Sequence, residues 1–219
     1  IATIPEKSID QLWMVVRRDI NGSPTRYVEF LEEPWLATEA FIEDAFFVDS
    51  GLTGDFNSPQ TTVAGLDHLE GQEVAVLTDG AAHPNRTVDN GQIELQFAAK
   101  KVQVGLSYTA GFRTFPFNTG TEDDTLSGKI KRIHKLHLFF FDTVGAKFGY
   151  DPNDLDIVKF RESSTPMDQA VPPFTGTKSL NFPMRHDLDA HLIVRSEQPL
   201  PITVLQAAAS MEFFGDESG

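Results

Sequence analysis

The sequence contains no cysteine, which excludes disulfide bonds, thiolate metal sites and cysteine nucleophiles. It also lacks a run of about 18 consecutive apolar residues, the length that a membrane-spanning helix needs. Its first residues do not form the basic and then apolar segment of a signal peptide. We therefore expect neither a membrane span nor a signal peptide in this chain. Because the chain begins with Ile1 and not with methionine, we expect it to be a piece cut from a longer protein.

Basic residues are the minority among the charged ones. Lys and Arg number 18 against 32 Asp and Glu, so the formal net charge is −14. A surface of this sign repels phosphate groups and anionic lipid, and we expect no specific nucleic-acid binding and no membrane partner. Hydrophobic residues make up 40% of the 219 residues, which is enough for the core of one large or two small domains.

The first third of the chain contains a strong hairpin signal. Asn21-Gly22 separates two β-rich runs, which predicts a β-hairpin with Arg17 and Arg18 on one arm and glutamates such as Glu29 on the other. Residues 37–47 have near-helical spacing of apolar positions and predict one short helix. Residues 51–62 are rich in glycine, proline and small polar residues, and predict a loop that ends in a domain boundary near Thr62.

Glycines punctuate residues 65–80, "GLDHLEGQEVAVLTDG", and could either turn the chain or cradle a ligand. No GxGxxG or GxxxxGK[ST] spacing is present, and the acidic side chains nearby would oppose a phosphate. We therefore expect turns at Asp79-Gly80 and Asn90-Gly91. They would join short strands at 73–78, at 92–96 and from Lys101, in a meander curled into a small barrel.

The later part of the chain is also β-rich. Residues 128–149 fit either a helical face or a strand, and the three consecutive phenylalanines favour the strand. Two more strands are expected at 190–195 and 202–213, separated by the proline-bracketed "EQPLP".

Histidines provide the one candidate metal set. His134 and His137, with His186 and His191, could combine with Asp187 or Asp189, because imidazole and carboxylate ligands often bind metals together. On a strand, however, a spacing of three residues puts His134 and His137 on opposite faces. We therefore predict no metal site and no cofactor.

Candidate catalytic patterns are incomplete. "FVDSGL", residues 47–52, has the Asp-Ser-Gly order of an aspartic protease, but the second copy that shares the proton is missing. No G-x-S-x-G pentapeptide is present for a serine hydrolase. Paired carboxylates of a glycan hydrolase, or aromatic platforms for sugars that include Trp13 and Tyr27, stay open as alternatives. We predict no catalytic residues, and we expect most of the 18 phenylalanines to fill a β core.

Several stretches, taken in order, resemble the tail nozzle proteins of short-tailed bacteriophages, also called tail tubular protein B or phage stabilisation protein. The matching stretches are "DQLWMVVRRDINGSPTRYVEFLE", "AFFVDSGLT", "GLDHLEGQEVAVLTDGAAHPNRTVDNGQIELQ", "VQVGLSYTAGFRTFPF", "GKIKRIHKLHLFFFDTVGAKFG" and "LIVRSEQPLPITVLQAAASMEF". The resemblance is to the last third of such a protein, and we expect the earlier β-rich, ring-forming region to lie outside the 219 residues. It implies a structural part of the genome-ejection conduit in the virion tail, made in the bacterial host cytoplasm. It also implies other tail subunits as partners and a ring-forming homo-oligomer of the full-length parent.

These observations together predict an all-β protein. We expect a main antiparallel sandwich formed by residues 1–62 together with 109–219, and a small barrel-like meander, residues 63–108, inserted between them. A conduit that passes DNA should not adsorb it, and the net charge agrees with that role. A tail-associated glycan hydrolase and a carbohydrate-binding receptor module are the alternatives.

Overall fold

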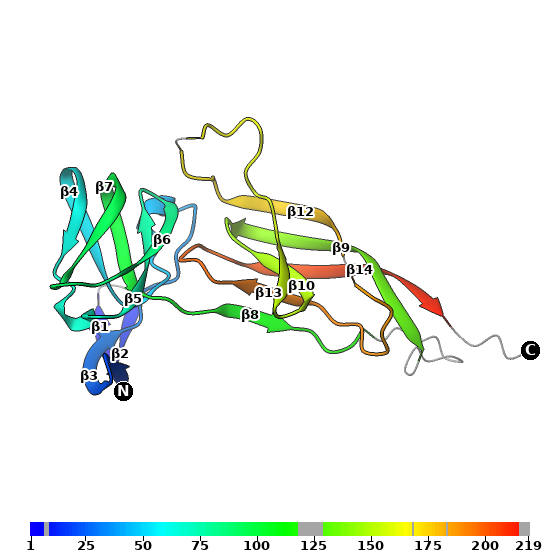
Figure 1. Ribbon diagram of the computed structural model, residues 1–219, viewed down its shortest axis with the longest axis horizontal. Helices are drawn as coiled ribbons and strands as arrows, with labels where there is room; N and C mark the ends of the chain where they lie inside the picture. Colours follow the sequence, from blue (N-terminus) through cyan, green and yellow to red (C-terminus); the bar gives the residue numbers. More distant parts are fainter. Residues whose placement is uncertain (7–8, 118–128, 168, 183, 215–219) are drawn as a thin grey trace, which may run out of the picture. The chain divides into compact units, whose positions relative to one another are not determined.

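The computed structural model describes residues 1–6, 9–117, 129–167, 169–182 and 184–214. These residues form antiparallel sheets without any α-helix, as the all-β prediction requires. None of the described elements is a helix of the length and apolar character needed to cross a membrane. The chain divides into two compact units, coloured mainly blue to green and mainly green to red in Figure 1. Unit 1 comprises Ile1–Tyr108, Pro166–Val171 and Gln198–Pro201, and unit 2 comprises Thr109–Thr165, Pro172–Glu197 and Ile202–Gly219.

Unit 1 consists of a three-stranded and a four-stranded sheet, in the orders β1-β2-β3 and β4-β7-β5-β6. The strands are β1 (Ala2–Glu6), β2 (Ile9–Ile20), β3 (Ser23–Phe30), β4 (Asp49–Ala64), β5 (Glu73–Thr78), β6 (Ala81–Thr87) and β7 (Gln92–Leu106). Ile20 and Tyr27 from the first sheet pack on a buried cluster of valines, leucines and isoleucines that belongs mainly to the second. Apolar burial thus joins the two sheets into one body.

The predicted hairpin is confirmed. β2 and β3 pair antiparallel from Trp13↔Phe30 to Ile20↔Ser23, around the two-residue turn Asn21-Gly22. Both turn residues have positive φ, 49° and 75°, as a type I′ turn demands.

The helix predicted over residues 37–47 is wrong. The segment contains a hydrogen-bonded turn at residues 37–39 and one 3-10 turn, η1 (Ile42–Asp44), with hydrogen bonds from Asp44 N to Phe41 O and from Ala45 N to Ile42 O. Ala45 returns to extended backbone and is fully buried, so the chain enters the core after one turn.

The loop predicted over residues 51–62 is also wrong, because this segment lies in β4, which pairs with β7. A Cβ on Gly51 would lie 2.7 Å from Val104 O, and one on Gly105 would lie 2.8 Å from the Gly51 Cα. These glycines therefore permit close approach of two strands and are not loop residues. Pro59 fits because β4 is an edge strand and its register with β7 is interrupted at this point.

The meander differs from the predicted small barrel. Residues 92–106 form one continuous strand in place of two, and residues 81–87, expected to be a turn region, form β6. The sheet remains open, with β4 and β6 at its edges, and closes no barrel. β5 is buried on both faces from Val74 to Leu77, where alternation was expected.

The division into units also differs from the predicted domains. Residues 1–62 were grouped with 109–219, but β4 pairs with β7 from Asp49↔Leu106 to Ala64↔Gln92, and Ile20 lies in the same core. Residues 1–62 and 63–108 therefore belong to one unit. The boundary at residue 108 is common to both divisions.

Unit 2 is built from two antiparallel sheets, in the orders β12-β9-β14 and β11-β10-β13-β8 (Figure 1). The strands are β8 (Ala110–Arg113), β9 (Ile130–Thr143), β10 (Lys147–Asp151), β11 (Asp154–Ile157), β12 (Phe174–Asn181), β13 (Ile193–Ser196) and β14 (Val204–Phe214). β9, β13 and β14 correspond to the strands predicted at 128–149, 190–195 and 202–213; Gly128 lies outside the described residues. Phe140 of β9 stacks edge-on against Phe160 at 5.2 Å, and Phe148 of β10 lies 6.1 Å from Phe182. Phe140, Phe148, Phe160 and Phe182 are thus buried in this core. The expectation that most of the 18 phenylalanines fill a β core is wrong, because eight of them are exposed, among them Phe41, Phe97 and Phe115.

Candidate functional site

A polar cluster of unit 1 lies on the inner face of the β2–β3 hairpin, where it meets β4. Arg18 donates two hydrogen bonds to Glu29, Nε to Oε1 at 3.0 Å and Nη2 to Oε2 at 2.9 Å, and lies 3.6 Å from Asp49. The Ser50 hydroxyl donates to Glu29 Oε1 at 2.7 Å, and His68 Nε2 lies 2.8 Å from Ser50 O. The ion pair between the arms was expected from the sequence, but Ser50 and His68 were not.

This cluster is poorly suited to nucleophilic catalysis. The hydrogen bond from Arg18 is the main reason that the pKa of Glu29 is lowered, so this carboxylate is a weak base toward Ser50. His68 contacts the backbone carbonyl of Ser50 and not its hydroxyl, which differs from the geometry of a catalytic triad. The cluster instead ties the hairpin to the start of β4, where Ser50 has the positive φ of 51°.

The acidic side chains of residues 65–80 bind backbone amides. Glu70 accepts hydrogen bonds from the amides of Asn90 and Gly91, and the Asp79 carboxylate accepts from those of Lys100 and Lys101. Asp79, Gly80, Asn90 and Gly91 all have positive φ, which confirms that these residues turn the chain. Asp79 thus holds its own turn against β7, and Glu70 holds the Asn90-Gly91 turn against the segment at residue 70. Local sequence gave no reason to expect either role.

The histidines of unit 2 are placed differently from the prediction. β9 has one extra residue opposite Ser210 and Met211 of β14, a β-bulge at His134. The bulge shifts the alternation, so that Ile133 and Leu136 are both buried while His134 is exposed and His137 half-buried. The expectation that His134 and His137 point to opposite faces is therefore wrong.

The other members of the proposed metal set make local contacts. His191 is buried, with Nδ1 2.9 Å from Asp189 O and Nε2 3.1 Å from Tyr150 O. Tyr150 donates its hydroxyl hydrogen to Asp187, which raises the pKa of Tyr150 and lowers that of Asp187. His186 packs edge-on against Phe214 at 4.5 Å. Over the described residues, no group of three or more His, Asp or Glu has a geometry that could hold a metal ion.

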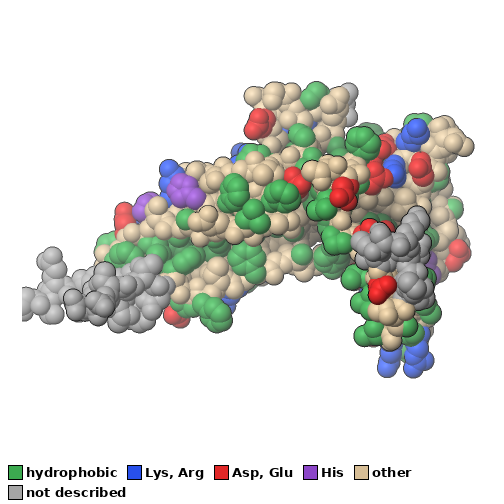
Figure 2. Space-filling view, turned by 180° about the vertical axis from the view of Figure 1, so that it is seen from behind, with side chains coloured by type: hydrophobic (Ala, Val, Ile, Leu, Met, Phe, Trp, Pro, Cys, Tyr) green, Lys and Arg blue, Asp and Glu red, His purple; other side chains and the backbone are tan. Residues whose placement is uncertain are grey.

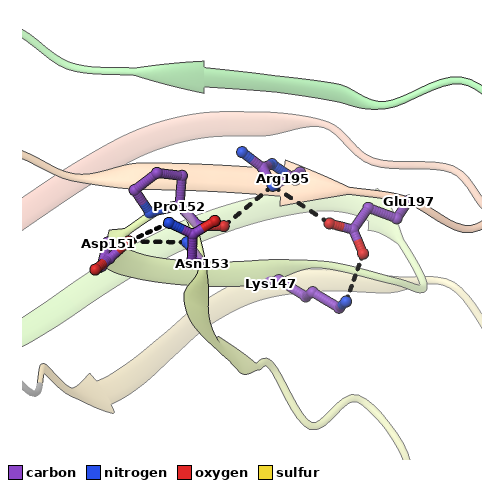
Figure 3. Close-up of polar contacts among 6 residues, drawn as sticks. All are labelled: Lys147, Asp151, Pro152, Asn153, Arg195 and Glu197. Atoms are coloured by element: carbon purple, nitrogen blue, oxygen red, sulfur yellow. Dashed lines mark hydrogen bonds and ion pairs between the residues drawn. The ribbon is translucent and has the colours of Figure 1, made fainter.

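A surface network joins β10, the β10–β11 turn and β13 (Figure 3). Lys147 Nζ lies 2.5 Å from Glu197 Oε2, and Arg195 Nη1 lies 3.5 Å from Glu197 Oε1 and 3.2 Å from Pro152 O. The hydrogen bond from Lys147 is the largest cause of the lowered pKa of Glu197. These contacts hold neighbouring strands together and leave no free carboxylate pair at this position.

The outer face of the β1–β2–β3 sheet has a different character. Val15 and Val28 lie directly opposite each other and are 64% and 70% exposed. The next outward pair, Trp13 and Phe30, has ring centroids 5.2 Å apart, and Phe30 is 45% exposed. Large apolar side chains on an ordered, solvent-facing sheet are typical of a surface that binds another molecule.

A scan of protein-family models and a search of curated proteins both found no match to this chain.

Proposed function

We propose that this chain is a structural segment of a bacteriophage tail tip or nozzle, located in the virion and forming part of the conduit through which the genome leaves. Its partners would be neighbouring tail subunits, and the full-length parent would form a ring of identical copies. The parent would be made in the cytoplasm of the bacterial host before assembly.

The sequence resemblance supports this proposal because the resembling stretches are spread over the strands of both units. The resembling stretches coincide with the β2–β3 hairpin, the start of β4, β5 to β7, β8, β9 and β13 to β14. They therefore cover the framework of both units and not a single pocket. A resemblance of this kind fits a protein whose role is to build an assembly.

The observation that carries the proposal is the outer face of the β1–β2–β3 sheet. Val15, Val28 and Phe30 expose apolar surface on regular strands, where a protein that works alone would place polar side chains. The polar clusters of both units, by contrast, bond strand to strand or turn to strand. This division of roles fits a subunit that is held together internally and binds its neighbours through apolar surface.

The charge supports the conduit role in a second way. A net charge of −14 opposes adsorption of a phosphate backbone during passage. Within the basic run 129–135, Lys131 is only 2% exposed and donates to Phe117 O, whereas Arg132 and Lys135 are exposed. The strand therefore divides these charges between two faces.

A carbohydrate-binding receptor module is a second candidate, and the Trp13–Phe30 pair favours it, because exposed aromatic rings can stack on sugars. The glycan hydrolase has less support. Its two carboxylates would have to be free in a cleft, whereas the two carboxylates of the polar cluster, Glu29 and Asp49, both lie beside Arg18.

Deletion tests the proposal directly. Removing residues 1–219 from the parent gene should yield particles with incomplete tails in negative-stain images and a loss of infectivity, restored by the wild-type gene in trans. Normal tails and full infectivity without this segment would contradict the structural role. Normal tails that no longer attach to host cells would favour the receptor module.

A further inference from the structure

We infer that the outer face of the β1–β2–β3 sheet docks a neighbouring protein subunit that presents apolar side chains bordered by carboxylates. This inference rests on the proposed function, since it assigns the surface through which the tail partner binds. The hairpin face is defined here by three cross-strand pairs, Trp13↔Phe30, Val15↔Val28 and Arg17↔Arg26.

The three pairs follow one another along the hairpin on the side away from the core. Residues between them, such as Val16 and Tyr27, point inward, and Tyr27 packs on the core of unit 1. The hairpin face thus changes from aromatic to aliphatic to cationic along its length. In Figure 2, hydrophobic side chains at the lower right give way to Lys and Arg side chains at the lower end of the same unit.

The arginine pair is the decisive feature. Arg17 and Arg26 occupy directly opposite positions, where like charges destabilise an antiparallel pair. Arg18, the next residue, points inward and forms an ion pair with Glu29 of the opposite strand. The inner face of the hairpin thus pairs its arginine with a carboxylate, whereas the outer face does not. Among the described residues, neither Arg17 nor Arg26 has an ion-pair partner within 4.0 Å. A fold that places two unpaired arginines together is suited to receive carboxylates from another molecule.

The character of the partner follows from the rest of the face. Two arginines are too few for a nucleic-acid site, which typically uses about six to ten phosphate contacts. Anionic lipid is opposed by the net charge of −14. A second copy placed face to face would need carboxylates where this hairpin has arginines. A different protein whose binding surface has an apolar centre and an acidic rim could contact both the apolar pairs and the arginine pair of the hairpin face.

The substitution Arg17→Glu separates docking from folding. It converts a like-charge cross-strand pair into an opposite-charge pair, so the melting temperature of the chain should stay the same or rise. Docking should fall by roughly tenfold or more, because a carboxylate would then face the partner's carboxylates. Val15→Thr with Val28→Thr keeps both residues β-branched and should weaken docking while preserving the strands. Lys159→Glu makes the same charge change at an exposed position of unit 2 and is the control.

The readout is a photo-crosslinking amino acid at position 28 of the full-length parent, followed by peptide mass spectrometry of purified particles. We expect a crosslink to another tail protein, at an apolar segment next to Asp or Glu. It should be lost in Arg17→Glu, retained in Lys159→Glu, and restored when the contacted acidic residue is changed to arginine.

Three results would overturn the inference: crosslinking to a second copy of the chain, crosslinking to glycan or lipid, or equal crosslinking in Arg17→Glu. Absence of the protein from the particles would instead refute the proposed function. Presence of the protein without any crosslink from position 28 would refute the docking surface alone.

Discussion

Single residues set the turns of unit 1, and Gly80 is the clearest case. Its φ is +80°, and a Cβ there would lie 2.5 Å from Ile42 Cγ2. Gly80→Val should therefore lower the free energy of unfolding by about 1–3 kcal/mol from backbone strain, with a further loss from the clash. Gly22→Val is the matched control, because Gly22 has φ +75° with nothing within 4 Å. Equal losses in urea unfolding would show that the contact with Ile42 is unimportant.

Glu29 links the hairpin to β4, and its ionisation should be visible in the pH dependence of stability. The pKa of Glu29 is lowered from 4.5 in the folded chain, chiefly by the hydrogen bond from Arg18. The stabilisation is therefore fully present above about pH 4.5 and is lost as the pH falls through the lowered pKa. Glu29→Gln should flatten the fall in melting temperature on the acid side, whereas Glu39→Gln, at an exposed position, should not. Identical acid profiles for wild type and Glu29→Gln would contradict this role.

At the scale of elements, β4 depends on close approach to β7. A Cβ on Gly51 would lie 2.5 Å from Val48 Cγ2 and 2.7 Å from Val104 O. Gly51→Ala should lower the free energy of unfolding by about 1–3 kcal/mol, because the backbone oxygen of Val104 is fixed in the sheet and cannot move away from the new methyl group. In Gly54→Ala the new methyl would meet the Phe56 ring at 2.9 Å, and a ring can rotate away. Thermal melts that rank Gly54→Ala as the more harmful change would overturn the close-packing explanation.

Local turn chemistry was readable in the sequence, and long-range packing was not. Asn21-Gly22 located the hairpin because a type I′ turn requires residues that tolerate positive φ. The composition of β4 suggested a loop, because nothing local shows that Gly51 faces Gly105 from another strand. The β-bulge at His134 similarly depends on the register with β14. Strand faces therefore could not be assigned by alternation alone.

The contacts of the candidate site that depend on local sequence could be predicted, and those between distant segments could not. The sequence predicted charge pairing between the arms of the hairpin, and Arg18 does pair with Glu29. Ser50 lies 21 residues from Glu29, and His68 lies 18 residues from Ser50, whose carbonyl oxygen it contacts. No short-range sequence pattern could therefore predict these contacts. The Arg17↔Arg26 pair could have been found once the hairpin register was known, because a two-residue turn fixes which residues are opposite.

For the whole molecule, charge leads to a prediction about DNA. With a net charge of −14 and Lys131 of the one basic run buried, the chain should bind neither single- nor double-stranded DNA at about 0.15 M salt. Fluorescence anisotropy across a salt series, with a basic DNA-binding protein as the positive control, checks this. Tight binding that weakens steeply with salt would contradict the conduit role.

Cryo-electron microscopy of the tail is the most direct measurement of the central claim. The particles to image are those produced from the genome that encodes the parent protein. The account predicts density at the tail tip into which both β units fit, repeated around the tail axis, with the hairpin face buried against a different subunit. Complete, infectious tails whose density has no place for either unit would contradict it.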